Sequence, residues 1–589
     1  MDSVEWEVLR HTASHILAQA VKRLFPDTKL GIGPAIRDGF YYDFEPTSKW
    51  TPDILLVIEK EVAKIIKENL PIRAQTISKE EAIKLFTEKN ETYKVELIKA
   101  IPENEPISIY TQGEFVDLCR GPHLAYTAKA KHMKLLSVAG AYWKGDEHNP
   151  MLQRIYGTAF PTKEELENYL TAMEEAKKRD HNKIGRELDY FTTTPYIGQG
   201  LPILMPNGAK VIQILSRFVE DEEESRGYLL TRTPYLAKSD LYKISGHWQH
   251  YRSGMFIIGD EQKDEEVFAL RPMTCPFQFQ VYLSQTRSYR DLPMRFNETS
   301  VLFRNEASGE MHGLIRVRQF TISEGHIACT PEQLEEEFAG CIDLTTYILT
   351  TIGLQEDITY QFSRFDPNDC EKYIGTTEQW NDVEQRMKVI LDKLNIPYQE
   401  AIGEAAFYGP KLDLQIRNVF GKEDTLITIQ IDFQLAQRFS MEYIDSEGIT
   451  RYPYIIHRTS IGCYERTLAL LLEKYAGALP TWIAPIQVAI IPITDQQAIY
   501  ATMIAKKLKE HHIRYILDDR KETMQNKIRQ STLQKIPYML VVGEKEAASP
   551  EQLVSIRQRS GASLPAMPID EFIKLIETQV KMRERNLIQ

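Results

Sequence analysis

Hydrophobic positions near the start of the chain follow two different periods. Residues 6–25 and 52–69 repeat apolar side chains at helical spacing, which predicts two amphipathic helices. Between them, residues 31–45 (GIGPAIRDGFYYDFE) combine glycines with alternating apolar residues, the pattern of a β-hairpin. We therefore expect one α+β unit over residues 1–160. From residue 161 to 189 the chain is strongly charged with few apolar anchors, which predicts a solvated helical connector.

Two further patterns divide the remainder of the chain. From about residue 185 to 480, strands and helices mix with long loops, as an antiparallel sheet flanked by helices requires. After TWIAPIQ (481–487), short apolar strands alternate with helices in β-α-β-α-β order. This alternation predicts a separate, mostly parallel α/β domain. The predicted divisions are residues 1–160, a helical linker at 161–184, 185–482 and 483–589.

Composition sets limits but does not indicate a function. With 589 residues, 43% of them hydrophobic and 26% charged, the chain can form several cores. It has no apolar run of about 18 residues, so we expect no membrane-spanning helix, and its start lacks the basic-then-apolar pattern of a signal peptide. Six scattered cysteines do not make a disulfide framework and fit a reducing cytoplasm. The net charge of −12 does not exclude nucleic acid, because phosphate binding depends on local basic patches.

The string VLFRNEASGEMHGLIRVRQF, which ends at Phe320, carries the densest chemistry. Its alternating apolar residues predict a strand, a loop and a second strand. The first strand would end at Arg304 and Glu306, and Arg316 and Arg318 would lie on the second. Guanidinium groups that converge across such a hairpin clamp a polyphosphate, because their donors are fixed and bidentate. Glu306 can accept from an exocyclic amine and the Phe320 ring can stack on a base; the alternative is a hairpin with surface arginines.

A group of histidines, a cysteine and a carboxylate marks the N-terminal unit. His11 and His15 lie four residues apart, on one side of a helix, and VDLCRGPHL supplies Asp117, Cys119 and His123. This spacing fits a zinc site. It fits equally a metal-free pocket in which imidazoles and a carboxylate position water, or two structural histidines beside a buried cysteine.

The string that ends at Phe320 resembles motif 2 of the class II aminoacyl-tRNA synthetases. RGYLLTRTPYLAKSDLYKISGHW and IGCYERTLALLLE resemble motifs 1 and 3. The resemblance implies an enzyme that binds ATP with Mg2+, and a homodimer built through motif 1, whose proline is Pro234. The implied contacts are Arg304 with the α-phosphate and the substrate carboxylate, Glu306 with the adenine amine, Arg316 with the γ-phosphate, Phe320 with the adenine ring, and Arg466 with the nucleotide phosphates.

Three strings resemble the editing domain of the threonyl-tRNA synthetase family: RHTASHILAQAVKRLFPDTKLGIGPAIRDGFYYDFE, VDLCRGPHL and AGAYWKGDEHNPMLQRIYGTAF. In the related alanyl enzyme the HxxxH and CxxxH residues bind zinc. In the threonyl family the resemblance implies hydrolysis of mischarged seryl-tRNA without a catalytic metal. The implied editing residues are His11, His15, Lys94, Asp117, Cys119 and His123. The ubiquitin-like domain that usually precedes this domain is expected to be absent.

A second Cys/His set is implied by the resemblance alone. Cys275, His326 and His457 lie too far apart in sequence to indicate a metal, but they match the zinc ligands of the threonyl family, one ion per subunit. Three protein ligands leave a position open for substrate. An apolar pocket separates valine from threonine by only about a hundredfold, whereas a zinc ion that chelates the amino and hydroxyl groups rejects valine. Serine carries both groups, so a second, hydrolytic pocket completes the selection.

Other strings agree with the family pattern or depart from it. AFYGPKLDLQI and ITIQIDFQ place Tyr408, Lys411, Asp413 and Gln430 at substrate-pocket positions. The departures concern residues next to the zinc ligands. Where most relatives have glutamine and aspartate, this chain has Ile322 and Glu324. Glu324 is the expected partner of the threonine amino group. At the first ligand, the string Cys-Pro-Phe-Gln replaces Cys-Pro-Gly-His.

The C-terminal domain resembles the anticodon-binding domain shared by the glycyl, histidyl, prolyl and threonyl synthetases. By position, Arg529, Glu546 and Arg557 are expected to contact tRNA, whose single-stranded bases are read through splayed edges and stacking. The alternative is that the basic residues of this domain only form a solvated surface, as such clusters usually do.

The resemblance covers essentially the whole chain. It implies an α+β multidomain protein with an antiparallel class II core, an α+β editing domain and an α/β anticodon-binding domain. The implied reaction is ATP-dependent ligation of L-threonine to tRNA(Thr) through threonyl-adenylate, with editing of seryl-tRNA(Thr), in the cytoplasm. The rivals are a synthetase for another amino acid, such as proline, with a borrowed editing domain, and a non-catalytic RNA-binding paralogue.

Overall fold

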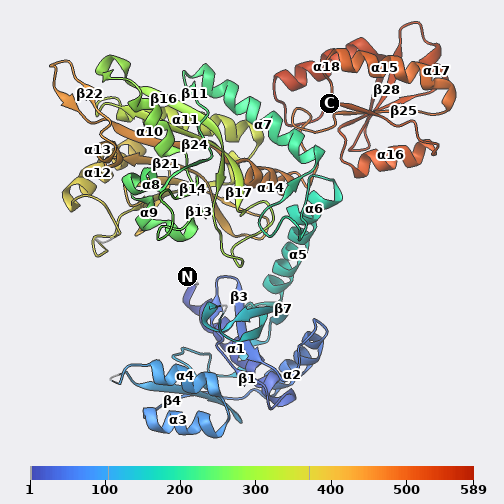
Figure 1. The fold of residues 1–589 in the computed structure, drawn as a ribbon. Helices are drawn as coiled ribbons and strands as arrows, with labels where there is room; N and C mark the ends of the chain where they lie inside the picture. Colours follow the sequence, from blue (N-terminus) through green and yellow to red (C-terminus); the bar gives the residue numbers. More distant parts are fainter. Residues whose placement is uncertain (1–2, 104, 147, 370–371, 589) are drawn as a thin grey trace. The chain divides into compact units, whose positions relative to one another are not determined.

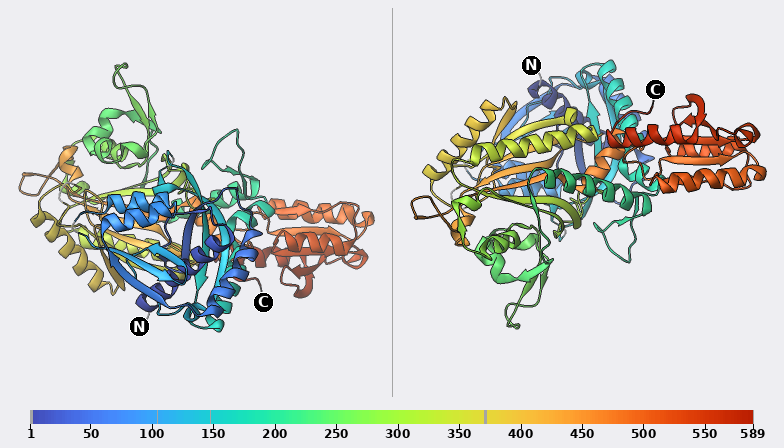
Figure 2. Two further views of the ribbon diagram at one scale, coloured as in Figure 1. Left: turned by 90° about the horizontal axis from the view of Figure 1, so that it is seen from below. Right: turned by 90° about the horizontal axis from the view of Figure 1, so that it is seen from above.

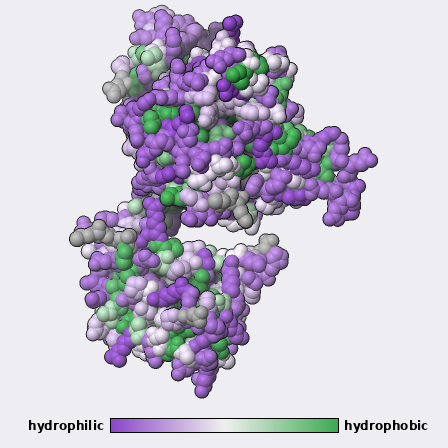
Figure 3. Space-filling view, turned by 90° about the vertical axis from the view of Figure 1, so that its left-hand side faces the viewer, coloured by the Kyte–Doolittle hydropathy of each residue, from purple (hydrophilic) through white to green (hydrophobic). Residues whose placement is uncertain are grey.

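The computed structural model describes residues 3–103, 105–146, 148–369 and 372–588. It divides between residues 174 and 175 into two compact units, which we describe separately (Figure 1). Helix α5 (Lys163–Arg179) spans this division. None of the helices that the structure describes is both long and apolar enough to cross a membrane. On the face shown in Figure 3, polar residues predominate on each unit and apolar residues lie in small scattered groups.

The N-terminal unit has two sheets and two pairs of helices. The larger sheet has the order β1-β3-β8-β7, with β2 beside β3, and the smaller sheet has the order β4-β5-β6. The strands are β1 (Lys29–Leu30), β2 (Ala35–Ile36), β3 (Gly39–Glu45), β4 (Ile72–Ile77), β5 (Ile107–Gln112), β6 (Phe115–Leu118), β7 (Met133–Tyr142) and β8 (Met151–Ala159), and the helices are α1 (Ser3–Leu24), α2 (Ile54–Glu68), α3 (Lys79–Glu88) and α4 (Thr92–Ala100). The predicted helices and hairpin of this unit are all present. Apolar residues of α1 such as Ile16 and Leu17 are fully buried against the larger sheet.

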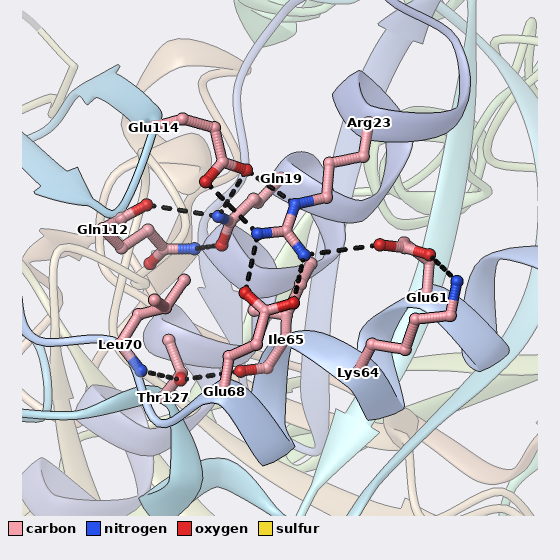
Figure 4. Close-up of polar contacts among 10 residues, drawn as sticks. All are labelled: Gln19, Arg23, Glu61, Lys64, Ile65, Glu68, Leu70, Gln112, Glu114 and Thr127. Carbon is pink, nitrogen blue, oxygen red and sulfur yellow. Dashed lines mark hydrogen bonds and ion pairs between the residues drawn. The ribbon is translucent and has the colours of Figure 1, made fainter.

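Arg23, near the end of α1, ties three elements of this unit together (Figure 4). Its guanidinium bonds to Glu68 on α2 through two contacts of 2.8 Å, and its Nε bonds to Glu114 at the β5–β6 turn at 2.6 Å. A third carboxylate, that of Glu61 on α2, lies 3.3 Å away. Beside it, Gln19 and Gln112 bond to each other at 2.8 Å. The β5–β6 hairpin is therefore fixed against α1.

The second unit contains an eight-stranded sheet with the order β11-β16-β17-β24-β21-β20-β18-β19. Its inner strands are antiparallel. At the two edges, β11 pairs in parallel with β16, and β19 pairs in parallel with β18. The strands are β11 (Leu229–Leu230), β16 (Met294–Phe303), β17 (Gln319–Cys329), β18 (Ile358–Arg364), β19 (Tyr398–Ile402), β20 (Lys411–Arg417), β21 (Glu423–Asp432) and β24 (Tyr454–Cys463). The helices are α6 (His181–Glu187), α7 (Pro206–Ser225), α8 (Ser239–Ser245), α9 (His247–His250), α10 (Cys275–Leu283), α11 (Leu334–Ile352), α12 (Thr377–Lys393), α13 (Leu435–Arg438) and α14 (Tyr464–Lys474). Residues of α7, α11, α12 and α14 share one core with this sheet.

Three small sheets lie beside this core. They have the orders β10-β9, β12-β14-β13 and β15-β22-β23. Their strands are β9 (Phe191–Thr192), β10 (Ile203–Leu204), β12 (Leu236–Lys238), β13 (Ile257–Ile258), β14 (Phe268–Leu270), β15 (Arg287–Ser288), β22 (Tyr443–Ile444) and β23 (Thr450–Arg451).

One strand prediction is wrong. Arg316 and Arg318 do not lie on the second strand of the hairpin, because β17 begins only at Gln319. The preceding backbone closes a turn, in which the N–H of His312 donates to the carbonyl of Arg316 at 3.1 Å. The N–H of Arg318 donates outside the hairpin, to Gly200 at 2.7 Å. These bonds take the donors that a longer β-ladder would need.

The C-terminal domain is a five-stranded sheet with the order β26-β25-β27-β28-β29. Its elements are β25 (Val488–Pro492), α15 (Ala498–Glu510), β26 (Tyr515–Leu517), α16 (Met524–Leu533), β27 (Tyr538–Val542), α17 (Glu544–Ala548), β28 (Leu553–Gln558), β29 (Ser563–Pro568) and α18 (Ile569–Lys581). The prediction of a mostly parallel sheet is only half correct, since β28 and β29 are antiparallel. Val488 and Ile490 pack against α15 and α18, and Ala489 and Ile491 face α16, so helices cover both faces (Figures 1 and 2).

Candidate active sites

A cavity of about 500 Å³ opens in the second unit. It gathers side chains from segments that lie far apart in the sequence. The predicted residues that line it are Cys275, Arg304, Glu306, Arg316, Phe320, Glu324, Tyr408, Lys411, Asp413, Gln430, His457 and Arg466. The structure therefore brings together the catalytic and substrate-binding residues that the sequence suggested for this unit.

Strand register explains this convergence. His326 on β17 lies opposite His457 on β24, and His457 lies opposite Gln430 on β21. Gln430 in turn pairs with Lys411 on β20. Four adjacent strands thus place one polar side chain each in a row across the sheet. The Tyr408 hydroxyl donates to Gln430 at 2.6 Å, which extends the row.

Four of the residues predicted to bind the nucleotide contact one another in two pairs. Nε of Arg316 lies 2.9 Å from Glu306, and the Arg304 guanidinium lies 5.1 Å from the centre of the Phe320 ring. Nε of Arg466 donates to the carbonyl of Ile315 at 2.9 Å. Binding a nucleotide at Glu306 and Arg316 would therefore exchange their mutual ion pair for ligand contacts.

Cys275, His326 and His457 are buried, and their ligand atoms all lie within 4.8 Å of one another. Nδ1 of His326 lies 2.5 Å from Gln278, and Nε2 of His457 lies 2.9 Å from Asp432. Second partners of this kind orient imidazole ligands. Among the residues that the structure describes, the buried Nε2 of His326 has no hydrogen-bond partner. A thiol and two oriented imidazoles, one with an orphaned nitrogen, are a donor set that could bind zinc.

The charge around this group also suits a cation. Burial raises the pKa of the Cys275 thiol well above its usual value, and the Glu324 and Asp432 carboxylates raise it further. The Glu324 carboxylate accepts from the backbone N–H of Thr274 at 3.1 Å and from its hydroxyl at 2.7 Å. Thr274 therefore fixes the longer side chain that stands in place of aspartate. Ile322, the other departure, packs against an apolar cluster that includes Phe320 and Cys463.

The N-terminal unit holds the second predicted cluster. His11 and His15 on α1 face Cys119 and His123 in the loop after β6, and the ligand atoms of the four lie within 4.8 Å of one another. The Cys119 sulfur lies 3.3 Å from Nε2 of His11 and 3.1 Å from Nε2 of His123. Burial lowers the pKa of all three histidines and raises that of the Cys119 thiol to about 12. The cluster therefore presents neutral imidazoles and a thiol.

A buried ion pair lies beside this cluster. Nζ of Lys94 on α4 is 2.7 Å from Asp117 on β6 and donates to the Tyr42 hydroxyl at 3.0 Å. Tyr42 donates to the other oxygen of Asp117 at 2.5 Å, and Nε2 of His15 is 3.7 Å from that oxygen. The structure thus brings all the predicted editing residues together in one cluster. The carboxylate beside this cluster is balanced by the Lys94 ammonium, whereas the Cys275 group has the carboxylates of Glu324 and Asp432 beside it.

The hydroxyl of Thr12 fixes the proton position on His123. It donates to the Val8 carbonyl at 2.8 Å and accepts from the backbone N–H of Leu124 at 2.9 Å. Because its single hydrogen is used, its 3.3 Å contact with Nδ1 of His123 requires that Nδ1 donates. The Nε2 lone pair of His123 then faces Cys119.

Comparisons with known proteins agree with this geometry. Three family models match: "tRNA synthetase class II core domain (G, H, P, S and T)" at residues 256–475, "Anticodon binding domain" at 487–579, and "Threonyl and Alanyl tRNA synthetase second additional domain" at 107–156. The threonine–tRNA ligase of Clostridium perfringens (strain 13 / Type A) is 59% identical over 584 residues, which cover 99% of this chain and 90% of the relative. The chain belongs to the threonine–tRNA ligase family. The ligase of Geobacillus kaustophilus (strain HTA426) is 46% identical over 582 residues, which cover 99% of this chain and 88% of that relative.

Solved structures of this family share the fold. The RNA binding domain of threonyl-tRNA synthetase from Cryptosporidium parvum Iowa II is 34% identical, with a TM-score of 0.63 over 68% of this chain and 98% of that one. A putative threonyl-tRNA synthetase, ThrRS-1, from Aeropyrum pernix is 26% identical, with a TM-score of 0.59 over 69% and 97%. A prolyl-tRNA synthetase from Cryptosporidium parvum, 17% identical with a TM-score of 0.52, shares the fold alone.

The sequence did not predict a role for several residues that the structure places in these two sites of the ligase. His247 lines the large cavity, and burial lowers its pKa to about 3, so it presents a neutral imidazole. Asp432 holds His457. Gln278, which the sequence marks only as part of the departure Cys-Pro-Phe-Gln, holds His326. Tyr42 bridges the ion pair in the N-terminal unit. His247, Asp432 and Tyr42 lie inside strings that carried the resemblance, but only the contacts show what they do.

Proposed function

We propose that this threonine–tRNA ligase activates L-threonine with ATP in the 500 Å³ cavity and transfers it to tRNA(Thr) in the cytoplasm. The observation that supports this most is the row His326–His457–Gln430–Lys411, whose last three residues line the same cavity as Arg304 and Arg466. Residues suited to a polar amino acid and residues suited to phosphates thereby share one space.

The chemistry of activation follows from the charges in the cavity. The threonine carboxylate attacks the α-phosphorus, the bond to the bridging oxygen breaks, and pyrophosphate leaves. Negative charge spreads over the phosphate oxygens in the transition state, and positioned guanidinium groups stabilise it. Arg304 and Arg466 would contact these oxygens together with Mg2+. Arg316 would leave Glu306 for the γ-phosphate, which frees Glu306 to accept from the adenine amine beside Phe320.

Cys275, His326 and His457 would hold one zinc ion per subunit. When bound, the ion supplies a Lewis-acidic position for the amino and hydroxyl groups of threonine. Asp432 and Gln278 keep the two imidazoles oriented, and Glu324, fixed by Thr274, would pair with the amino group. Tyr408 and Gln430 complete the walls of the amino-acid site, and Lys411 stands at its edge.

The N-terminal cluster would hydrolyse seryl-tRNA(Thr) without a metal. Neutral imidazoles can position a water molecule and accept its proton. In the tautomer that Thr12 fixes, Nε2 of His123 carries the lone pair that would accept this proton once water displaces its contact with the Cys119 thiol. Water adds to the ester carbonyl, and the ribose oxygen leaves with a proton. The Lys94 ammonium balances the Asp117 carboxylate, which lowers the attraction of this site for a divalent cation, and it would stabilise negative charge on the carbonyl oxygen. His11, His15 and Cys119 complete the pocket.

Two partner surfaces belong to the same proposal. Around Pro234, the side chains of Leu229, Leu230 and Tyr235 are each more than half exposed, which suits the homodimer contact of motif 1. In the C-terminal domain, the exposed Arg529 and Arg557 and the partly buried Glu546 would contact the anticodon. The domain divisions at 160, 184 and 482 remain part of this proposal.

The experiment that tests the proposal is ATP–pyrophosphate exchange with threonine, valine, serine and proline, run with and without a zinc chelator. We expect exchange with threonine, weak exchange with serine, none with valine or proline, and loss of exchange after chelation. Exchange with proline would favour the rival synthetase. The absence of exchange with every amino acid would favour a non-catalytic paralogue.

A further inference from the structure

A third group of ionisable side chains lies outside both sites. His181 begins α6 and is completely buried, and Nδ1 of its ring lies 2.7 Å from Glu473 in the last turn of α14. Asp180 lies 3.6 Å from the same nitrogen. The ligand atoms of these three residues lie within 4.8 Å of one another, but both ring nitrogens of His181 have protein partners, so we do not assign a metal here.

Hydrogen-bond accounting fixes the state of the His181 ring. The backbone N–H of Leu314 points at Nε2 from 3.2 Å. A backbone N–H can only donate, so Nε2 must carry the lone pair. Nδ1 therefore carries the hydrogen and donates to the Glu473 carboxylate. The second oxygen of that carboxylate accepts from the backbone N–H of Val419 at 3.2 Å. Glu473, His181 and the backbone N–H of Leu314 thus form one chain of hydrogen bonds, which we call the relay.

The relay holds the turn that precedes β17. Gly313 has a φ of +50°, and a Cβ added there would lie 2.1 Å from Nε2 of His181, so the backbone at 313 and 314 rests directly on the imidazole. Two residues later comes Arg316. The same turn is tied to α14 a second time, because Arg466 donates to the carbonyl of Ile315.

We propose that His181 is a positioning residue for ATP. It transmits the position of α14 to the turn that carries Arg316, so that one helix sets both Arg466 and Arg316 against the nucleotide. Arg466 bonds to Ile315 directly, and Glu473 holds the adjacent Leu314 through His181. The inference rests on the proposed contact between Arg316 and the γ-phosphate.

Two substitutions separate the halves of the relay. In His181→Gln the amide oxygen stands near the place of Nε2 and can still accept from Leu314, while donation to Glu473 is lost. In His181→Asn the amide nitrogen stands near the place of Nδ1 and can still donate to Glu473, while the Leu314 N–H is left without an acceptor. Because an unsatisfied buried donor is costly, we expect His181→Asn to raise KM for ATP about tenfold.

His181→Gln should raise KM for ATP by no more than about threefold, since the turn keeps its acceptor. KM for threonine and the zinc content should be unchanged in both. The control is His511→Gln, which breaks an exposed histidine–glutamate contact of 2.8 Å in the C-terminal domain and should leave KM for ATP unchanged. Gly313→Ala is a second route to the same effect, because it pushes the turn away from an intact His181.

The readout is pyrophosphate exchange at varied ATP, with thermal melting in parallel. A loss of thermal stability in both His181 variants with an unchanged KM for ATP would overturn the proposal, as would an unchanged KM in Gly313→Ala. If Arg316→Ala also leaves KM for ATP unchanged, the proposed function of Arg316 fails. If Arg316→Ala raises it and His181→Asn does not, only the role of His181 fails.

Discussion

Two clusters in this chain use the same kinds of side chain, one cysteine and two or more histidines, in different electrostatic surroundings. The Cys275 group is faced by the carboxylates of Glu324 and Asp432. The Cys119 group lies beside the buried ion pair of Lys94 and Asp117, in which the ammonium balances the carboxylate. Excess negative charge favours a divalent cation, whereas a carboxylate already balanced by an ammonium attracts one less. The comparison teaches that metal binding depends as much on the charges around the ligands as on the ligands themselves.

The largest effect should come from removing the Cys275 thiol, which belongs to the group formed with His326 and His457. We expect Cys275→Ser to lose its zinc and to lower threonine-dependent pyrophosphate exchange more than about 100-fold, since even residues behind metal ligands are worth 10- to 100-fold. Binding of tRNA should be retained, because the C-terminal domain is untouched. The measurements are metal analysis, exchange and tRNA filter binding. Full zinc content in this variant would refute the site.

The same substitution logic applied to the other cluster should separate the two activities. We expect His11→Ala to slow deacylation of seryl-tRNA(Thr) by about 10²–10³-fold, the scale of positioned acid–base catalysis, and to leave threonine charging intact. His148→Ala, which removes an exposed histidine paired with Asp146 in the same unit, is the matched control. An unaltered deacylation rate in His11→Ala would show that the cluster does not edit.

Much of this comparison could be drawn from the sequence. The helix that carries His11 and His15 and the strand that leads to Arg304 were predicted because their apolar periods are strong. The connector was predicted because it is highly charged with few apolar anchors. The row of His326, His457 and Gln430 could not be, because strand order and register are set by contacts between distant segments. The position of Arg316 in a turn was missed for a similar reason. Backbone donors there bond to Gly200 and within the turn, which local alternation does not reveal.

A smaller effect should follow from the tautomer of His123. Thr12→Val keeps the shape of the side chain but removes the acceptor of the Nδ1 hydrogen, so we expect deacylation of seryl-tRNA to fall about tenfold with charging unchanged. Thr12→Ser should restore most of the rate. Nitrogen-15 histidine spectra should show Nδ1–H on His123 in the wild type. Equal rates in the valine and serine variants would contradict the assignment.

The smallest effect concerns the ion pairs of Arg23, which stabilise the N-terminal unit that carries this cluster. Arg23→Gln should lower the free energy of unfolding of the N-terminal unit by about 1 kcal/mol, the upper range for partly exposed ion pairs. Hydrogen bonding to Arg23 lowers the pKa of Glu114 from 4.5 to about 2. A depressed carboxyl pKa stabilises the fold above pH 4.5, and this contribution disappears as the pH falls toward 2. Denaturant melts at pH 7 and pH 3 should therefore differ less in the variant than in the wild type; an equal difference would exclude the role.

The central claim is that one Cys/His cluster binds zinc and the other does not. The most direct measurement is the zinc content per chain of the purified protein and of its Cys275→Ser and Cys119→Ser variants. The account predicts one zinc ion in the wild type, none in Cys275→Ser and one in Cys119→Ser. Two ions in the wild type, or loss of zinc on substitution of Cys119 alone, would contradict it.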